Sequence, residues 1–240
     1  METVQVWVAP LDVAPTVLAS LAATLSPAER VRAGRFCFPV DARRFIAAHG
    51  WLRNVLGDTL GIAPAQLALT DGPGKPRLAD EAAPRFNLSR SAGVALVAVA
   101  AHDVGVDVEH AVAEDVNVGL DLARVACTPA ELAELHRLPP PVWGHALLRR
   151  WTVKEAFLKA TGVGLALPPD QVEVGAEEPD GAVPVQAVGR PARWWARLLE
   201  PAPGYLGAVV AAGREWTVQI RSVADLGGQQ PAAADCAVAP

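Results

Sequence analysis

The chain has 240 residues, of which 51% are hydrophobic and 20% charged, a composition typical of a globular protein with a core for one large domain or two small ones. Its net charge of −5 argues against the broad basic surface of a nucleic-acid-binding protein. The longest apolar run, residues 92–101, is half the length that a membrane-spanning helix needs. The N-terminus lacks the pattern of a signal peptide, and three cysteines show no metal-type spacing. We therefore expect a cytoplasmic protein that binds neither nucleic acid nor a membrane.

The first half of the sequence predicts a strand, then helices, then further strands. Ser26-Pro-Ala-Glu29 is a capping box with proline at the first helical position, so a helix should begin there. A second helix should begin at Pro39 and end at Gly57. Residues 71–76 form a predicted turn. The predicted strands are residues 3–8, 86–89, 94–101 and 104–108.

The second half repeats this order of elements. Thr128-Pro-Ala-Glu131 is again a capping box, and a long helix should run over residues 141–161, closed by Gly162. Apolar segments at residues 183–188, 193–199, 205–212 and 216–223 are predicted strands. The residues after 223 are rich in Gly, Gln, Pro and Ala, which indicates a flexible tail over 224–240.

The two halves also match in sequence. Arg43-Arg44-Phe45 and Arg149-Arg150-Trp151 lie 106 residues apart, and the segments beginning at Gly93 and Gly204 are alike. This repetition indicates an internal duplication. We expect an α+β fold with two similar halves related by a pseudo-twofold axis, residues 1–105 and 106–223, and a site in the cleft between them.

The segment Val104-Gly-Val-Asp107-Val-Glu109 places two carboxylates on one face of a predicted strand. A hard divalent cation such as Mg²⁺ would relieve their repulsion, since Mg²⁺ binds one or two carboxylates together with phosphate oxygens. A solvated strand end is the simpler interpretation of the same pattern.

The helical segment Trp151-Thr-Val-Lys154-Glu155-Ala-Phe-Leu-Lys159 carries a second group of charges. Lys154 and Glu155 border the apolar stripe of this helix, where a buried charge needs a partner. An ordinary Glu155–Lys159 pair one turn apart would explain two of the three charges. At the 106-residue offset, Lys154 matches Ala48 and Glu155 matches His49, so this alignment predicts that the charges serve a site rather than the fold.

A third group comprises Lys75-Pro-Arg77 and the segment Phe86-Asn-Leu-Ser89-Arg90-Ser91. A lysine in a turn, a hydroxyl and an arginine near strand ends suit a phosphate group. A polar surface turn is the alternative interpretation.

These three groups, in this order, resemble the motifs of the 4′-phosphopantetheinyl transferases of the long, surfactin-synthetase-activating type. That family has Lys-Pro, then Phe-Asn-Leu-Ser-His-Ser, then Gly-[Ile/Val]-Asp-[Ile/Val]-Glu, then Trp-x-x-Lys-Glu-[Ala/Ser]-x-x-Lys. The matching motifs span residues 75–159. Arg90 stands where the family has histidine. Arginine can still bind the 3′-phosphate of coenzyme A, so we expect slower transfer from dephospho-coenzyme A.

The resemblance implies a monomeric pseudo-dimer that moves 4′-phosphopantetheine from coenzyme A to a serine of an apo acyl or peptidyl carrier protein of polyketide or nonribosomal peptide synthesis, releasing adenosine 3′,5′-bisphosphate. By carry-over, Mg²⁺ would be held by three carboxylates and the phosphates by lysines, with Glu155, or a water it orients, as the base. The implied metal ligands are Asp107, Glu109 and Glu155; the implied coenzyme A contacts are Arg44, Lys75, Ser89, Arg90, Lys154 and Lys159; the implied catalytic residues are Glu155, Lys159 and Lys154.

Two alternatives remain from the sequence. The chain could be a non-catalytic module that grips coenzyme A or a carrier domain, an interpretation that only Arg90 favours. It could also be a different magnesium-dependent enzyme acting on a nucleotide pyrophosphate, although the sequence has no Gly-x-x-x-x-Gly-Lys-[Ser/Thr] phosphate loop.

Overall fold

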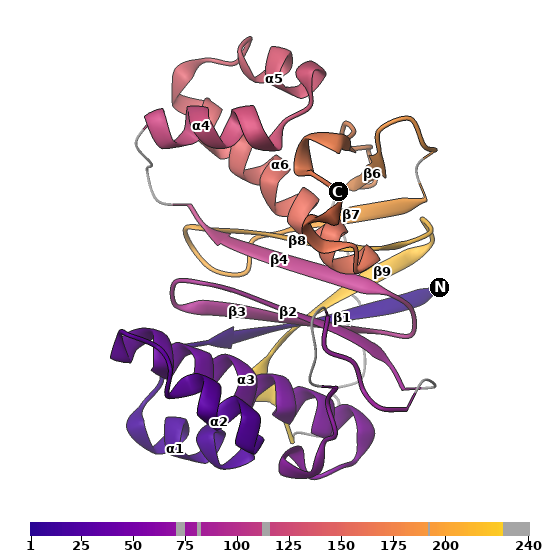
Figure 1. Cartoon of the computed structure of the whole chain (residues 1–240). Coiled ribbons are helices and arrows are strands. Elements are labelled where there is room, and N and C mark those ends of the chain that lie inside the picture. Colours follow the sequence, from indigo (N-terminus) through magenta and orange to yellow (C-terminus); the bar gives the residue numbers. More distant parts are fainter. Residues whose placement is uncertain (71–74, 81–82, 112–115, 192, 228–240) are drawn as a thin grey trace, which may run out of the picture.

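The computed structural model describes residues 1–70, 75–80, 83–111, 116–191 and 193–227. It is built of four layers, with two sheets stacked between two groups of helices (Figure 1). The predicted α+β class is confirmed. The start of the turn predicted at residue 71 and most of the tail lie outside the described residues. No helix in the described part of the chain is long and apolar enough to span a membrane.

The first sheet and its helices come mainly from the first half of the chain. Its four strands lie in the order β2-β3-β1-β9. Strand β3 is antiparallel to both β1 and β2. The elements are β1 (Glu2–Pro10), α1 (Pro15–Thr24), α2 (Pro27–Ala33), α3 (Pro39–Leu60), the 3-10 helix η1 (Pro64–Gln66), β2 (Arg85–Ser91) and β3 (Val94–Ala100).

The second sheet has five antiparallel strands in the order β4-β8-β7-β6-β5. Its elements are β4 (Val104–His110), α4 (Val116–Ala126), α5 (Pro129–Leu135), α6 (Pro140–Thr161), η2 (Gly164–Ala166), η3 (Pro169–Gln171), β5 (Val172–Val174), β6 (Ala182–Ala187), β7 (Trp194–Leu199) and β8 (Tyr205–Ala212).

The halves repeat one topology. In each, the first strand pairs with the last one, and the last strand also pairs with the one before it, giving β2-β3-β1 and β7-β8-β4. Each half also has a 22-residue helix, α3 or α6, that ends at a left-handed glycine. Those glycines are Gly61, with φ 65°, and Gly162, with φ 70°. The predicted end of α3 at Gly57 is wrong, because this glycine lies inside the helix, where a Cβ would stand 2.7 Å from the Ile62 carbonyl oxygen.

The last strand crosses the predicted boundary between the halves. β9 (Trp216–Ser222) runs parallel to β1 and forms the edge of the first sheet. The 3-10 helix η4 (Val223–Asp225) follows, and Val223 is buried in the core of the first half. A division into 1–105 and 106–223 is therefore wrong at its final strand, and the ordered chain extends beyond residue 223.

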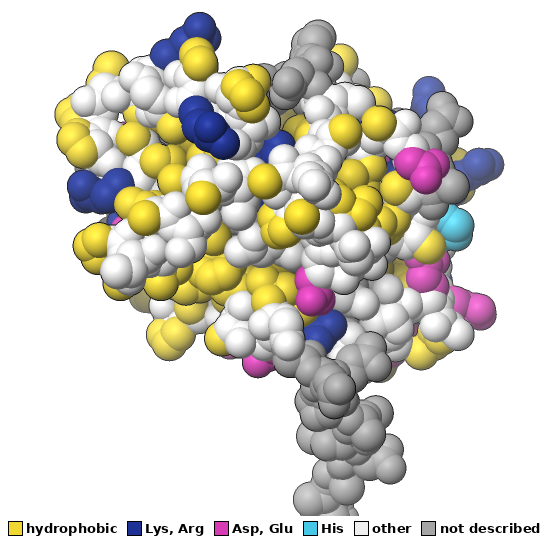
Figure 2. All heavy atoms as spheres, turned by 90° about the horizontal axis from the view of Figure 1, so that it is seen from below, with side chains coloured by type: hydrophobic (Ala, Val, Ile, Leu, Met, Phe, Trp, Pro, Cys, Tyr) yellow, Lys and Arg dark blue, Asp and Glu magenta, His cyan; other side chains and the backbone are white. Residues whose placement is uncertain are grey.

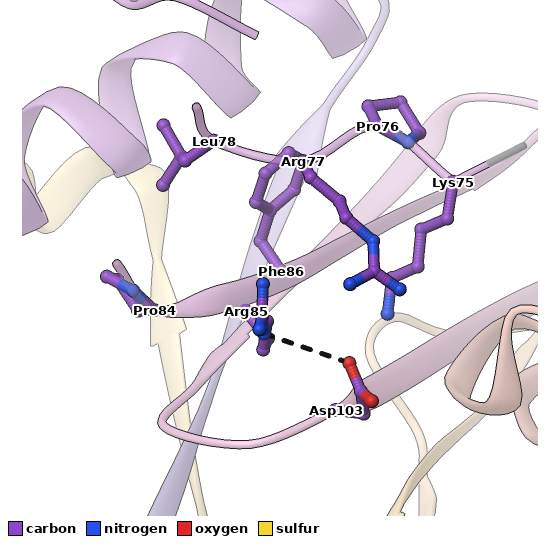
Figure 3. Close-up of a pocket in the computed structure, with 8 residues that line it drawn as sticks. All are labelled: Lys75, Pro76, Arg77, Leu78, Pro84, Arg85, Phe86 and Asp103. Carbon is purple, nitrogen blue, oxygen red and sulfur yellow. Dashed lines mark ion pairs between the residues drawn. The ribbon is translucent and has the colours of Figure 1, made fainter. Parts of the chain in front are cut away.

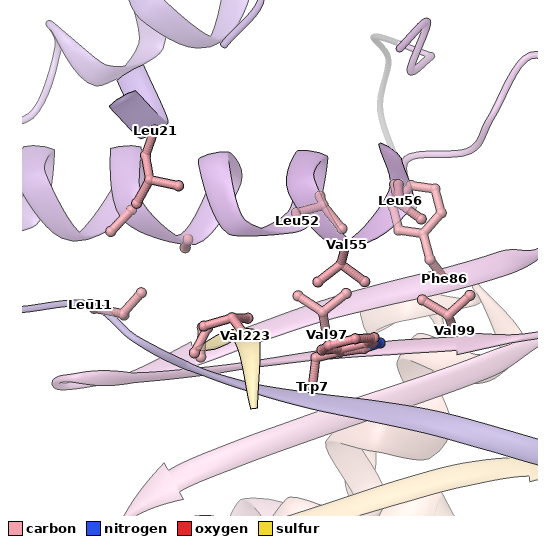
Figure 4. Close-up of a cluster of buried hydrophobic side chains, with 14 of the residues drawn as sticks. Trp7, Leu11, Leu21, Leu52, Val55, Leu56, Phe86, Val97, Val99 and Val223 are labelled. Atoms are coloured by element: carbon pink, nitrogen blue, oxygen red, sulfur yellow. The ribbon is translucent and has the colours of Figure 1, made fainter. Parts of the chain in front are cut away.

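Three large hydrophobic clusters hold the layers together. One lies between the sheets, where Val6 and Leu96 meet Val106 and Val209. A second joins the first sheet to its helices, with Trp7 and Val97 below α3 (Figure 4), and a third packs α6 on the second sheet. Many hydrophobic side chains on the outer helical face of the first half are exposed to solvent (Figure 2). In α1, the buried residue is Leu21.

Both capping boxes brace the long helix beside them. In the first half, the Glu29 carboxylate accepts from Arg53 Nε at 2.7 Å, and Arg53 also donates to the Pro64 carbonyl oxygen at 3.1 Å. In the second half, Glu131 accepts from Lys154 Nζ at 2.5 Å, and Lys154 donates to the Pro169 carbonyl oxygen at 3.1 Å. The structural counterpart of Lys154 is therefore Arg53.

The alignment at an offset of 106 residues is thus wrong for the long helices. α3 and α6 have the same length and begin 101 residues apart. An offset of 101 residues pairs Lys154 with Arg53 and Glu155 with Asn54. Arg53 and Lys154 each pair with the glutamate of a capping box, so Lys154 belongs to the scaffold. Glu155 has no acidic counterpart in the first half.

Candidate functional site

A seam of polar side chains joins β2 of the first half to β4 of the second. Ser89 Oγ donates to Asp107 Oδ1 at 2.7 Å, and Ser91 Oγ donates to Glu109 Oε2 at 3.0 Å. Alternate side chains of a strand lie on one face, so Ser89 and Ser91 of β2 lie opposite Asp107 and Glu109 of β4. At the next step along the seam, the Asn87 amide oxygen accepts from the backbone N–H of β4 at 2.8 Å.

One face of α6 lies over this seam. Trp151, Glu155 and Lys159 follow one another at intervals of four residues, which places them on one side of the helix. Lys159 Nζ lies 2.5 Å from Asp107 Oδ1 and 2.9 Å from Ser89 Oγ. Trp151 Nε1 donates to Glu109 at 3.3 Å. The structure thus brings together Asp107, Glu109, Glu155, Lys159 and Ser89, which are residues that the family resemblance implies for the site.

A glycine of β4 permits this close approach. A Cβ on Gly105 would stand 2.0 Å from the Ala156 carbonyl oxygen and 2.4 Å from the Ala160 nitrogen, inside α6. No side chain fits there, so the helix backbone can lie directly on the strand. The glycine two residues before Asp107 therefore sets how near the charges of α6 come to those of β4.

The electrostatics of the cluster disfavour three ionised carboxylates. Burial raises the pKa of Asp107 against the lowering effect of Lys159. Burial and the Asp107 charge raise the pKa of Glu109. Burial also raises the pKa of Glu155, against Lys159 and together with the Asp107 and Glu109 charges. A further positive charge at this position would stabilise the ionised forms.

One atom of the cluster also lacks a partner. Asp107 Oδ2 is buried and makes no hydrogen bond within the described residues, which is costly for a carboxylate oxygen. The described residues contain no group of three His, Cys, Asp or Glu side chains already arranged around a metal position. The unpaired oxygen and the repulsion among three carboxylates nevertheless fit a hard cation bound with oxygen ligands from elsewhere.

A hollow of about 260 Å³ opens beside the cluster, between the two halves. Asn87 and Leu88 of β2 line one side, and Glu155 and Lys159 of α6 line the other. Lys75 also reaches this hollow. Two ammonium groups and a carboxylate therefore face one open space, an arrangement that suits a phosphate ligand next to a proton acceptor.

Lys75 also lines a second, smaller pocket, together with Arg77, Arg85 and Asp103 (Figure 3). Its ammonium donates to the Val104 carbonyl oxygen. Burial lowers the pKa of Lys75 to about 8; Asp103 opposes the shift, whereas Arg77 and Arg85 add to it. Lys75 is therefore close to losing its charge at neutral to mildly basic pH.

The remaining predicted coenzyme A contacts lie apart from this cluster. Lys154 is fully buried, and its ammonium is taken up by Glu131 and two carbonyl oxygens, so it does not reach the hollow. Arg90 is exposed on the opposite face of β2 from Ser89, with its guanidinium 6.0 Å from the Phe36 ring centre. Arg44 makes a bidentate ion pair with Asp12, at 2.9 and 2.8 Å.

Three functional neighbours were missed from the sequence: Ser91, Asn87 and the indole of Trp151. The signal for the first two was present, because Asn87, Ser89 and Ser91 repeat at the same two-residue spacing as Asp107 and Glu109. No pattern in the sequence indicates that the indole N–H of Trp151 faces a carboxylate.

Comparison with known proteins agrees with this geometry. A model of the 4′-phosphopantetheinyl transferase superfamily matches residues 103–210. The chain is 38% identical over 221 residues to 4′-phosphopantetheinyl transferase HetI of Nostoc sp., covering 90% of each protein. It is 26% identical over 200 residues to 4′-phosphopantetheinyl transferase Sfp of Bacillus subtilis, covering 83% of this chain and 87% of that protein.

Proposed function

Since the chain belongs to the 4′-phosphopantetheinyl transferase superfamily and transfers 4′-phosphopantetheine from coenzyme A to a carrier protein, we propose that Asp107, Glu109 and Glu155 hold a Mg²⁺ ion for that transfer. The observation that carries this proposal is the buried, unpaired Asp107 Oδ2 within a cluster of three carboxylates. The relatives named as transferases favour an enzyme over a non-catalytic binding module.

When bound, Mg²⁺ would supply neutralisation of the charge on the pyrophosphate oxygens of coenzyme A. Asp107 would offer its unpaired oxygen, and Glu109 would offer lone pairs that its two hydrogen bonds leave free. The Glu155 carboxylate makes no hydrogen bond within the described residues and is free to contribute to the same ion.

Lysines at the hollow are proposed to hold the phosphates. Lys159 lies on Asp107 and Ser89 in this structure, so its ammonium is already at the junction of the two halves. Lys75 reaches the same hollow from the other side. Lys159 would stabilise the negative charge that grows on the leaving phosphate, because its position is fixed before the reaction. Arg90 and Arg44, which lie outside this hollow, stay predicted contacts for the 3′-phosphate and the adenine.

The proposed reaction is a displacement at phosphorus. The serine oxygen of the carrier protein forms a bond to the phosphorus on the pantetheine side, and the bond from that phosphorus to the bridging oxygen breaks. Adenosine 3′,5′-bisphosphate leaves with the electron pair. Glu155 accepts the serine proton, directly or through one water. Burial raises the pKa of Glu155 above its usual value, which makes this carboxylate a stronger proton acceptor.

The decisive experiment uses mass spectrometry on a mixture of apo carrier proteins incubated with coenzyme A. With Mg²⁺, a carrier should gain the mass of one phosphopantetheine, and a chelator should prevent this. The Glu155→Gln variant should lose at least about 99% of the rate, because it removes both the charge and the proton acceptor. Glu215→Gln, at an exposed glutamate between β8 and β9, is the control. Normal transfer by Glu155→Gln, or transfer unaffected by the chelator, would refute the proposal.

A further inference from the structure

The polar seam contains two groups of side chains, called rungs below, that have the same arrangement but differ in charge. In each rung, a serine of β2 and a donor of α6 meet a carboxylate of β4. Asp107 receives both donors, Ser89 and Lys159, on the same oxygen. Glu109 receives Ser91 on Oε2 and Trp151 on Oε1, one donor to each oxygen.

We infer that Trp151 is a positioning residue that, together with Ser91, clamps the Glu109 carboxylate in the orientation in which it binds the metal ion. This inference rests on the metal site proposed above. A carboxylate on a strand can rotate about its side-chain bonds, and donors on both oxygens remove that freedom. Groups that orient metal ligands in this way commonly change metal affinity when they are replaced.

The clamp uses only neutral donors. An indole N–H and a hydroxyl fix the carboxylate without cancelling its charge, whereas Lys159 in the other rung already offsets Asp107. Glu109 makes no ion pair within the described residues. No ion pair therefore offsets the charge of Glu109, whereas a lysine or arginine in place of Trp151 would neutralise it.

A further hydrogen bond fixes the orientation of the Ser91 hydroxyl in the clamp. The Ser91 hydroxyl accepts from the backbone N–H of His110 at 3.1 Å, so its proton is directed at Glu109. Trp151 stands one helical turn before Glu155, on the same face of α6. A shift of the indole would thus release Glu109 without displacing the helix.

The test is calorimetric titration of Mg²⁺, and of Mn²⁺ as a second probe, into the protein saturated with coenzyme A and without carrier protein. Trp151→Phe keeps an aromatic side chain but removes the pyrrole ring with its N–H, and we expect it to weaken metal binding about tenfold. Trp51→Phe is the matched control, because its indole donates to the Pro10 carbonyl oxygen at 3.0 Å, in the first half. This control should bind the metal as tightly as the parent protein.

Two further readouts separate positioning from folding. The melting temperature should fall by similar small amounts in both variants, since each loses one partly exposed hydrogen bond. In the transfer assay, Trp151→Phe should raise the Mg²⁺ concentration for half-maximal rate by a larger factor than it lowers the maximal rate. Ser91→Ala should shift metal binding in the same direction.

The outcomes that overturn the inference are distinct from those that overturn the proposed function. If Trp151→Phe binds Mg²⁺ as tightly as the parent protein, the clamp is refuted and the metal site stands. If the parent protein saturated with coenzyme A binds neither Mg²⁺ nor Mn²⁺, both proposals fail. An equal loss of affinity in Trp151→Phe and Trp51→Phe would also refute the clamp, because it would show a general loss of structure.

Discussion

Lys75 is a cation whose charge depends on pH near the working range of the protein. Its ammonium lies against a backbone carbonyl at the rim of the hollow, where burial lowers its pKa to about 8. An arginine at the same position would stay charged over the whole accessible range. The strength with which this rim holds a phosphate should therefore change with pH.

We expect the KM for coenzyme A to rise as the pH is raised through about 8, because Lys75 loses its proton while the phosphates of coenzyme A stay fully ionised. Steady-state kinetics between pH 6.5 and 9.5 measures this. Lys75→Arg should flatten the KM profile in that interval. A parent protein whose KM is constant over this interval would show that Lys75 does not contact the phosphates.

Lys154 shows why a residue in a motif need not touch the substrate. Its ammonium and the Glu131 carboxylate form a buried ion pair at 2.5 Å, with side chains 0% and 4% exposed. The first half has the same kind of ion pair, between Arg53 and Glu29, and neither of these residues is a proposed site residue. The charge of Lys154 is thus explained by the support that α6 receives from the N-terminus of α5.

Lys154→Met should lower the free energy of unfolding by about 3–5 kcal/mol, since it leaves Glu131 buried and unpaired. Arg53→Met should have an effect of similar size. Chemical denaturation followed by circular dichroism measures both, and Glu131→Gln in the Lys154→Met background should recover part of the loss. A phosphate contact predicts the reverse pattern, an unchanged stability and a raised KM for coenzyme A.

At the level of elements, the contact of β4 with α6 decides the geometry of the site. Gly105 lets the helix backbone rest on the strand, and the side chains that follow on both elements then converge. Gly144 lies in the same helix, and a Cβ there would meet nothing within 4 Å. These two glycines make a matched pair for substitution by alanine.

Gly105→Ala should destabilise the protein by about 3 kcal/mol, or shift α6 and lower the transfer rate, because the new methyl group overlaps three backbone atoms of α6. Gly144→Ala should be neutral or stabilising by up to about 1 kcal/mol, since it improves helix propensity at an open position. Thermal melting and the transfer assay compare the two. Equal effects of the two substitutions would contradict the close contact.

The sequence predicted the elements better than their relations. Both capping boxes form as predicted, because they are local. The end of α3 was misplaced because glycine serves both as a helix end and as a point of close packing, and a sequence does not separate these uses. The offset of 106 residues between the halves was wrong because it rested on matching arginine and aromatic residues. The correspondence of the long helices is shown instead by ion pairs between segments that are distant in the sequence. Asp107, Glu109 and Glu155 can be named as candidates from the sequence because their motifs are local. The contact of the Trp151 indole cannot, because its partner is 42 residues away.

At the scale of the whole molecule, the two halves depend on each other. The apolar faces of their sheets pack together, and β9, which follows the second half, completes the first sheet. Neither half has a full complement of strands and a covered sheet by itself. The molecule is therefore one cooperative unit despite its repeated topology.

A chain of residues 1–103 alone should not fold, because it lacks β9 and exposes Val4, Val6, Leu96 and Ala98. Circular dichroism should show no cooperative melting for this fragment. Co-expression with residues 104–227 should restore a single transition. A sharp thermal transition for 1–103 alone would contradict the dependence.

The return of β9 to β1 also affects how the protein is made. β1 emerges from the ribosome long before its partner β9, because residues 11–215 separate the two strands. At common rates of synthesis, β1 waits on the order of ten seconds for β9. During this time it presents an unpaired edge and an apolar face, which are the features that promote association between nascent chains. The yield of folded protein should therefore depend on translation speed and on chaperones that shield the first sheet.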